Sequence, residues 1–430
     1  MTVELIIDRL AFGGNGVGRL DGKAIFVPFT APGDRVRCRI VKDKGRWAEA
    51  ELVELLSPAA QRVTPPCPVF GRCGGCQWQH LPYAEQAAAK EAIFREQLVR
   101  HADAPAEALL PVVQAPAPFA YRSRVQFKCH HTPSGFVLGF YRRGSHYVED
   151  IVACPLVPDA LNELLPGLRA AIAATSVADR VPQIDLSIDD AGARRAVVHV
   201  LPGAEQIIAA ALEPVARPAG LALFLQIGRK ETLLPVCGAA ELTITCDEPP
   251  LRLAYGPGGF AQVNLAQNRS LVAAAMAAAQ LQGGERVLDL YCGMGNFSLP
   301  LARRCREVVG VEDYAPSIAQ ATRNAAANGL ANVRFLVRPA TGALTQLAAA
   351  APFDVVFLDP PRAGAYELCR EFLAIRPPRI VYVSCDPATL ARDLKPLLHN
   401  GYRLVSSQSF DFFPQTHHIE SLTRLEWSGV

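Results

Sequence analysis

From about Leu251 to the end of the chain, patterns typical of β-strands and α-helices alternate. Such alternation predicts a doubly wound α/β domain. Within it, RVLDLYCGMGNFSLPLARR reads as a buried strand, a tight loop at Gly293 and Gly295, and a helix that starts near Asn296. Glycines in that loop let a ligand approach the backbone at the carboxyl edge of the sheet. We therefore expect a binding cleft at this edge.

The ligand of this cleft is indicated by two further features. EVVGVED is a second strand that ends at Glu312, about twenty residues after the glycine loop, where a carboxylate holds ribose hydroxyls. The loop reads D-L-Y-C-G-M-G-N after Asp289 is included, and it lacks the third glycine of dinucleotide-binding folds. It resembles the loop of class I S-adenosyl-L-methionine (SAM) methyltransferases, which have a Rossmann-like fold. We expect SAM as the cofactor, with NAD as the less favoured ligand.

A further strand, FDVVFLDPPRAG, ends at Asp359. The two prolines after it cannot continue the strand, so the chain leaves the sheet edge with the carboxylate aimed into the cleft. In the same fold a D-P-P motif commonly meets a flat nucleobase. We therefore expect a base above the cofactor at this point.

RIVYVSCDPATLARDL reads as the next strand, with Cys385 at its end and a helix after it. A helix N-terminus lowers the pKa of a nearby thiol, and the sheet edge is open to substrate. A methyltransferase needs such a thiol when its target is carbon 5 of uracil, because that carbon is too poor a nucleophile to attack a methyl sulfonium unaided. Thiolate addition at carbon 6 gives an enolate whose carbon 5 takes the methyl group.

The same chemistry needs a base that removes the proton from carbon 5, so that the thiolate is eliminated. FPQTHHIESLTRLEW supplies Glu420 between the last two strand patterns. The residues that flank it are apolar or aromatic: Phe412, Phe413, Ile419 and Leu422. They predict a partly buried carboxylate with a raised pKa, and a solvated surface acid is the alternative.

Four motifs, in their order G-G-F-A-Q-V-N, F-L-D-P-P-R-A-G, S-C-D-P-A-T-L-A-R-D and F-P-Q-T-H-H-I-E-S, resemble those of the bacterial RNA (uracil-C5)-methyltransferase family over essentially the whole chain. The resemblance implies Cys385 as nucleophile and Glu420 as base. It also implies a set of cofactor and active-site residues: Gln262, Tyr291, Asn296, Glu312 and Asp359. After the third strand of the domain the chain reads VRPAT, where relatives place a polar residue near the adenine, so no residue is carried over there.

Cys67, Cys73 and Cys76 are spaced C-x5-C-x2-C, and Cys154 follows later in the context C-P-L-V. Four thiolates bind either tetrahedral zinc or an iron–sulfur cube, and the spacing alone does not decide between them. The family resemblance implies a [4Fe-4S] cluster on these four residues. Four ligands leave no open iron, so we expect a structural cluster that fixes a loop of an RNA-binding domain.

Residues 1–58 show short strand patterns joined by Gly and Pro turns, which predicts a small closed β-barrel of the OB type. This barrel resembles a TRAM domain. Residues 35–46 hold six basic side chains against Asp43, and Trp47 follows. A basic strand beside an aromatic suits a nucleic-acid face, and an edge strand charged against aggregation is an equal alternative.

Residues 59–250 are expected to form an α+β domain that carries the cluster, and residues 251–430 the catalytic domain. In the central segment, residues 121–147 interleave basic and aromatic side chains, which suits an unpaired RNA strand. The target uridine must then be extruded from its stack to reach Cys385.

The resemblance to a TRAM domain, together with the cluster that the family implies, favours 23S ribosomal RNA as substrate. The alternatives are another ribosomal site, a tRNA uridine, a cytosine-C5 RNA methyltransferase, or a non-catalytic RNA-binding iron–sulfur protein.

The whole chain of 430 residues has a formal net charge of +2, which by itself flags no affinity for nucleic acid. Its twelve cysteines are too sparse for a disulfide scaffold. Neither a signal peptide nor a membrane span is visible. We therefore expect a cytoplasmic protein with no membrane association. The family resemblance implies ribosomal RNA as its partner and no obligate protein partner.

Overall fold

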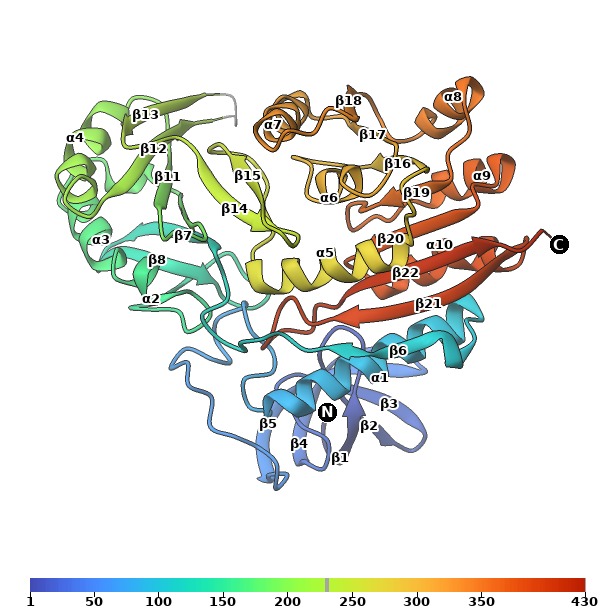
Figure 1. Ribbon diagram of the computed structural model, residues 1–430. Coiled ribbons are helices and arrows are strands. Elements are labelled where there is room, and N and C mark those ends of the chain that lie inside the picture. The colour runs from blue at the N-terminus through green and yellow to red at the C-terminus, as the bar shows by residue number, and fades with distance from the viewer. Residues whose placement is uncertain (229–231, 430) are drawn as a thin grey trace.

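The amino-terminal segment folds as the expected closed barrel. The computed structural model describes residues 1–228 and 232–429, and Figure 1 shows the barrel at the bottom of the view. The strands follow one another around the barrel in the order β1-β2-β3-β5-β4. Their bounds are β1 Thr2–Leu10, β2 Gly16–Leu20, β3 Lys23–Val27, β4 Arg35–Asp43 and β5 Trp47–Ser57. Alternate side chains such as Val36 and Cys38 point inwards and fill a small core. Because the barrel is closed, none of its strands has a free edge.

The central part of the chain is built on a seven-stranded sheet with the order β13-β12-β11-β10-β7-β8-β9. The strands are β7 Arg124–Thr132, β8 Gly135–Tyr141, β9 Val148–Asp150, β10 Gln183–Ile188, β11 Arg194–Val200, β12 Leu221–Ile227 and β13 Leu233–Cys237. The helices that accompany them are α2 Asp159–Asn162, α3 Leu165–Ala173 and α4 Glu205–Ala216. Short 3-10 turns lie at η1 Ala106–Ala108 and η2 Ala178–Arg180. Leucines of α3 and α4 pack on this sheet and give it a core of its own.

The carboxyl-terminal part is the doubly wound α/β domain that the sequence predicts. Its sheet has the order β18-β17-β16-β19-β20-β22-β21-β6, in which only β22 runs antiparallel to its neighbours. The strands are β16 Arg286–Leu290, β17 Glu307–Glu312, β18 Val333–Val337, β19 Val355–Leu358, β20 Arg379–Ser384, β21 Tyr402–Phe410 and β22 Glu420–Trp427. The helices are α5 Leu265–Ala279, α6 Ser298–Ala302, α7 Ala315–Ala327, α8 Ala343–Ala350, α9 Tyr366–Ile375 and α10 Pro387–Leu398.

Helices cover both faces of this sheet, and each face has its own apolar core. Residues of α5, α6 and α7 pack on one face, and residues of α8, α9 and α10 on the other. The strand order reverses between β16 and β19, so the crevice at their carboxyl ends is the expected place for a ligand.

Two elements from the predicted central segment belong structurally to the carboxyl-terminal sheet. Helix α1 (Tyr83–Ala102) packs against α10, and Ile93, Phe94 and Leu98 enter the core on that face. Strand β6 (Leu109–Val113) pairs in parallel with β21 and forms the edge of the sheet. A separate hairpin of β14 (Leu242–Cys246) and β15 (Leu251–Tyr255) crosses the boundary expected at residue 250. The three-domain division stays a prediction, and the chain between the domains is more interwoven than a simple succession.

Within residues 1–228 and 232–429, no helix combines the length and the apolar character that a membrane crossing requires.

Candidate active site and cysteine cluster

The glycine loop after β16 has the backbone that a ligand-binding turn requires. Gly293 and Gly295 have φ of +54° and +97°, and a Cβ on Gly295 would lie 2.4 Å from the Leu299 side chain. Tyr291, which is not a glycine, is held at φ +62°. Non-glycine residues rarely adopt this conformation, and it is typical of functional turns.

Three of the predicted cofactor residues lie around this loop. Tyr291 directly follows β16, and Glu312 is the last residue of β17, the neighbouring strand. Asn296 exchanges two amide hydrogen bonds of 2.9 and 3.0 Å with Asn268 of α5. Asn268 was missed from the sequence because only the fold brings α5 onto the loop. All three predicted residues are therefore at the carboxyl edge of the sheet.

Buried carboxyl groups surround this edge. Asp289 is 1% exposed and accepts a hydrogen bond from Ser298, yet burial raises its pKa to about 7, with Asp359 and Glu312 adding repulsion. Burial also raises the pKa of Glu312, against a hydrogen bond of 3.0 Å from the Tyr314 N–H. Asp359, directly after β19, has a pKa raised by burial to about 7. Crowded acids of this kind favour a ligand that carries positive charge.

Gln262 lies apart from these residues along the chain, in the connection between β15 and α5. Asn264, two residues later, caps α5 and donates to the Phe412 carbonyl at 3.2 Å. The connection therefore approaches the loop between β21 and β22. The role of Gln262 in cofactor binding stays a prediction.

Cys385 and Glu420 are brought together by the antiparallel pairing of β20 and β22. Ser384, the last residue of β20, stands opposite Ser421. One step further along this register places Cys385 opposite Glu420, the first residue of β22. Directly opposed residues have Cβ atoms about 5 Å apart. The two residues with predicted catalytic roles thus face each other at the carboxyl edge of the sheet.

Electrostatics at this pair confirm one expectation and correct another. Burial and the charge of Asp359 raise the pKa of Glu420 to about 8, as expected from its apolar neighbours. The expectation of a lowered thiol pKa is wrong: burial, together with Glu420 and Asp359, raises the pKa of Cys385 to about 12. Helix α10 does begin directly after Asp386, but the Asp386 carboxylate caps it, accepting from the N–H groups of Ala388 and Thr389. The helix N-terminus is therefore already occupied by an anion.

Arg362 is the cation of the site. It lowers the pKa of both Cys385 and Glu420, and its guanidinium lies 3.0 Å from the Nδ1 of His418. It follows Asp359 in the D-P-P-R segment, so the motif itself was the signal that could have identified it. Arg362 is the group in place to favour the thiolate.

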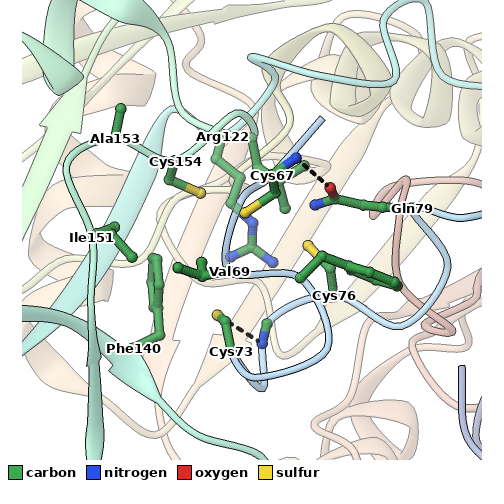
Figure 2. A pocket seen from close by; sticks show the side chains of 13 residues that line it. Cys67, Val69, Cys73, Cys76, Gln79, Arg122, Phe140, Ile151, Ala153 and Cys154 are labelled. Atoms are coloured by element: carbon green, nitrogen blue, oxygen red, sulfur yellow. Dashed lines mark hydrogen bonds between the residues drawn. The ribbon is translucent and has the colours of Figure 1, made fainter. Parts of the chain in front are cut away.

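The four predicted cluster cysteines line a single cavity of about 110 Å³, shown in Figure 2. Cys67, Cys73 and Cys76 come from the loop before α1, and Cys154 comes from the connection between β9 and α2. All four are free thiols. Across residues 1–228 and 232–429, however, no three His, Cys, Asp or Glu side chains are arranged to hold a metal ion. The cysteines converge, but metal binding stays a prediction.

Both basic segments expected to meet RNA are partly neutralised. On the barrel, Arg37 pairs with Glu4 at 2.7 Å and with Glu54, and Arg39 pairs with Glu51 at 2.6 Å. In the central domain, Arg72 and Arg142 share Glu149, at 2.8 and 2.7 Å.

The aromatic residues of the central segment divide between core and surface. Tyr121, Phe127 and Phe136 are buried, whereas Tyr141 and Tyr147 are 41% and 76% exposed. The exposed part of the expected platform is therefore smaller than the sequence suggests.

The strand order, the glycine loop and the carboxylate after β17 define a class I SAM-dependent methyltransferase. Two family models match the chain: tRNA (Uracil-5-)-methyltransferase over residues 243–427 and TRAM domain over residues 1–53.

Relatives match over almost the full length. The 23S rRNA (uracil(1939)-C(5))-methyltransferase RlmD of Alkalilimnicola ehrlichii is 39% identical over 97% of this chain and 95% of its own. The protein of the same name from Azoarcus sp. is 37% identical over 98% of this chain and 99% of its own. The tRNA (uracil-54, C5)-methyltransferase of Pyrococcus abyssi, solved with S-adenosyl-L-homocysteine, has a TM-score of 0.76 at 25% identity and covers 98% of this chain and 99% of its own. The chain therefore belongs to the RNA (uracil-C5)-methyltransferase family and carries its TRAM domain.

Proposed function

We propose that this enzyme transfers a methyl group from SAM to carbon 5 of one uridine in 23S ribosomal RNA, through a covalent adduct between Cys385 and carbon 6. The names of the full-length relatives support the ribosomal substrate. The observation that carries the covalent mechanism is the pairing of β20 with β22, which ends at Ser384 and Ser421, the residues next to Cys385 and Glu420. Glu420 is also near enough to affect the pKa of Cys385. A non-catalytic RNA-binding protein would not need this pair. A cytosine-C5 enzyme uses the same thiol addition, but it carries different motifs around its cysteine.

The residues divide the chemistry as follows. The Cys385 thiol gives its proton to solvent, assisted by the positive charge of Arg362, and the sulfur bonds to carbon 6 as the 5,6 double bond opens to the enolate. Carbon 5 then takes the methyl group that SAM supplies. Glu420 removes the proton from carbon 5, the carbon–sulfur bond breaks, and the methylated uracil is released. A carboxyl with a pKa of about 8 holds that proton well once it has taken it.

We further propose that Cys67, Cys73, Cys76 and Cys154 hold a [4Fe-4S] cluster. Support comes from the shared cavity and from its sulfur-rich lining, which is otherwise mostly apolar, as at Val69, with Gln79 and Arg122 as polar members. A cube binds each of its four thiolates to a different iron, whereas a single zinc ion would hold all four. The cluster would tie Cys154 to the loop before α1.

The barrel and the exposed edge of the central domain are proposed to bind structured RNA while the target uridine is extruded towards Cys385. The matched TRAM domain supports this. An enzyme that acts on ribosomal RNA works in the cytoplasm, and no obligate protein partner is invoked.

An RNA with 5-fluorouridine at the target position tests the mechanism. Fluorine cannot leave carbon 5 as the proton does, so the methylated adduct cannot be resolved and should persist with the wild-type protein in a denaturing gel. Cys385→Ala should form no adduct. An undiminished adduct with Cys385→Ala would overturn the assignment of the nucleophile.

Mass-spectrometric mapping of 5-methyluridine in cells that lack the gene tests the substrate. We expect one site in 23S ribosomal RNA to lose its methyl group while tRNA is unchanged. Loss of the modification from tRNA alone would place the chain with the tRNA enzymes.

Anaerobically purified protein tests the cluster. Iron and sulfide should each approach about four per chain, and Cys154→Ser should lower both. Stoichiometric zinc without sulfide would replace the cluster with a zinc site.

A further inference from the structure

The loop between β21 and β22, residues 411–419, has a few internal hydrogen bonds, such as that from Thr416 to the Phe413 carbonyl, and many more to other parts of the chain. It begins after Phe410 and ends at Glu420, and these two residues pair with each other across the sheet. At its start, the Asp411 N–H donates to the Val113 carbonyl of β6 at 2.9 Å. The path of this loop therefore sets the direction from which the chain enters β22 at Glu420.

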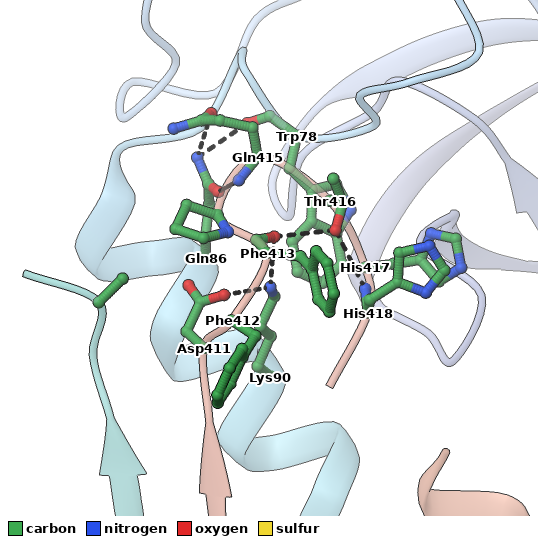
Figure 3. A network of polar contacts seen from close by, with 12 residues as sticks. Trp78, Gln86, Lys90, Asp411, Phe412, Phe413, Gln415, Thr416, His417 and His418 are labelled. Atoms are coloured by element: carbon green, nitrogen blue, oxygen red, sulfur yellow. Dashed lines mark hydrogen bonds and ion pairs between the residues drawn. The ribbon is translucent and has the colours of Figure 1, made fainter. Parts of the chain in front are cut away.

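Donors from α1 and from the central domain take up the loop's acceptors. The buried Lys90 of α1 donates to Asp411 at 2.6 Å and to the Phe413 carbonyl at 2.9 Å. The Tyr121 hydroxyl donates to the Pro414 carbonyl at 3.0 Å. Figure 3 shows how closely α1 and the loop approach each other. Such a network fixes one loop conformation, because each buried group would lose its partner in another.

Gln415 is the centre of this network, and nothing in the proposed chemistry uses it. It is 2% exposed, and its backbone is held at φ +71°, a conformation that residues other than glycine rarely adopt. Its N–H donates to Gln86 Oε1 at 2.8 Å, and its Oε1 accepts from Gln86 Nε2 at 2.9 Å. Its own Nε2 donates to the Pro118 carbonyl at 3.3 Å. The strained backbone is thus held by a fully paired side chain.

The carbonyl of Gln415 leads directly to the cysteine loop. It accepts from the N–H groups of Gln77 and Trp78 at 3.0 and 3.1 Å, and these two residues immediately follow Cys76. A second link lies beside it, where Gln77 Oε1 is 3.2 Å from His417 Nδ1. The cysteine loop and the loop that precedes Glu420 are therefore joined through two residues of the latter, Gln415 and His417.

We propose that Gln415 is a positioning residue for the reaction: it fixes the 411–419 loop against the segment after Cys76, so that the cysteine loop determines where the Glu420 carboxylate meets the proton on carbon 5. The inference rests on the proposed role of Glu420. It gives the cysteine loop a part in the last chemical step, beyond holding RNA.

The consequence is specific to one step. A displaced Glu420 leaves thiolate addition and methyl transfer intact but slows proton removal, so the methylated adduct accumulates on ordinary uridine RNA. A misplacement of about 1 Å costs up to about 100-fold in rate. We expect kcat to fall by about 10- to 100-fold in Gln415 variants. KM for RNA should fall with it, so that kcat/KM is little changed, because the slowed step comes after methyl transfer.

The test compares four proteins on unmodified RNA with methyl-labelled SAM. Gln415→Asn tolerates positive φ but its shorter amide does not reach Gln86, and Gln415→Ala removes the amide altogether. Gln408→Ala is the matched control, because Gln408 lies on β21 and donates only to the Pro111 carbonyl at 2.8 Å. Glu420→Gln is the reference for loss of the base. Adduct, kcat, KM and the visible absorption of the cluster are recorded for each.

Accumulated adduct in both Gln415 variants, with unchanged cluster absorption and normal turnover by Gln408→Ala, supports the inference. Turnover by Gln415→Asn equal to that of Gln408→Ala, while Glu420→Gln accumulates adduct, overturns it. A raised KM without adduct, or loss of the cluster absorption, also overturns it, because Gln415 would then serve RNA binding or the cluster. If Glu420→Gln itself accumulates no adduct, it is the proposed role of Glu420 that fails.

Discussion

At the scale of single residues, the site is a group of buried acids with one cation beside them. Burial raises the pKa of Asp289, Asp359 and Glu420, and Arg362 partly opposes this for Glu420. Burial, and after it the charges of Glu420 and Asp359, raise the pKa of the Cys385 thiol. A bound sulfonium would relieve this excess of negative charge, so the acids favour the charged cofactor as well as providing the base.

The pH dependence of adduct breakdown should report Glu420. The carboxylate accepts a proton only when ionised, and its pKa is raised to about 8. The rate of breakdown should therefore rise as pH increases through about 8 and level off above it. Single-turnover measurements from pH 6 to 10 check this, and Glu420→Gln should show a slow rate without that rise. A rate that falls over this range would contradict Glu420 as the base.

Arg362→Gln should move that profile to higher pH. Arg362 lowers the pKa of Glu420 and of Cys385, so its removal raises both, and both groups then ionise at higher pH. The midpoint of the rate profile should shift upwards and the rate at pH 7 should fall. Arg370→Gln, a change of the same kind on an exposed position of α9, should leave the midpoint in place. An unchanged midpoint in Arg362→Gln would remove Arg362 from the site.

The residue-scale features that sequence could predict are those that depend on local order along the chain. Cys385 follows a strand and precedes a helix, and Glu420 sits among apolar neighbours, so position and raised carboxyl pKa were readable. The raised thiol pKa was not, because it depends on Glu420 and Asp359, which reach Cys385 only through strand pairing. Asn268 was missed for the same reason.

At the scale of elements, β4 shows that the positive charge of a strand can be neutralised by the neighbouring strands of its sheet. Its arginines alternate on the outer face as expected, but glutamates of β1 and β5 stand beside them. Arg37 and Arg39 are therefore already paired before any RNA arrives. Lys44 and Arg46, in the turn between β4 and β5, are exposed and form no ion pair within the described residues. This turn, next to Trp47, therefore carries positive charge that no acid neutralises within the described residues, as does the exposed Arg19 of β2.

Substitutions in this turn should therefore weaken RNA binding more than substitutions in the strand. Each phosphate contact contributes about 0.7 to 0.9 to the slope of log K against log salt. Lys44→Gln with Arg46→Gln should lower the magnitude of that slope by up to about 2 and reduce affinity. Arg39→Gln should change neither, because Glu51 already neutralises Arg39. Equal effects of the two changes, measured by titration at several salt concentrations, would contradict this division.

At the scale of the whole molecule, the chain returns to the catalytic sheet twice. Helix α1 and β6 lie between the barrel and the central domain in sequence, yet α1 packs on α10 and β6 extends the sheet beside β21. The helix can be recognised from the sequence, because Pro82 stands before a long segment without Gly or Pro. The five-residue segment LLPVV, which contains a proline, gives no indication of the sheet that it joins. Long-range pairing of this kind is set by tertiary packing, which local patterns do not encode.

This arrangement predicts which fragments of the chain can fold on their own. A fragment of residues 240–430 keeps the β14–β15 hairpin and every catalytic residue but lacks α1 and β6, so it exposes the apolar face of α10 and leaves β21 as a bare edge. It should show no cooperative unfolding transition by calorimetry. A fragment of residues 59–430 lacks only the barrel, which has its own core, and should unfold cooperatively at a lower Tm. A cooperative transition in the shorter fragment would mean that the catalytic domain folds without α1 and β6, and that the contact between α1 and the 411–419 loop is not needed for folding. If the shorter fragment shows no cooperative transition, the catalytic domain needs α1 in order to fold. The helix that holds the 411–419 loop, and with it the position of Glu420, would then be part of the catalytic fold itself.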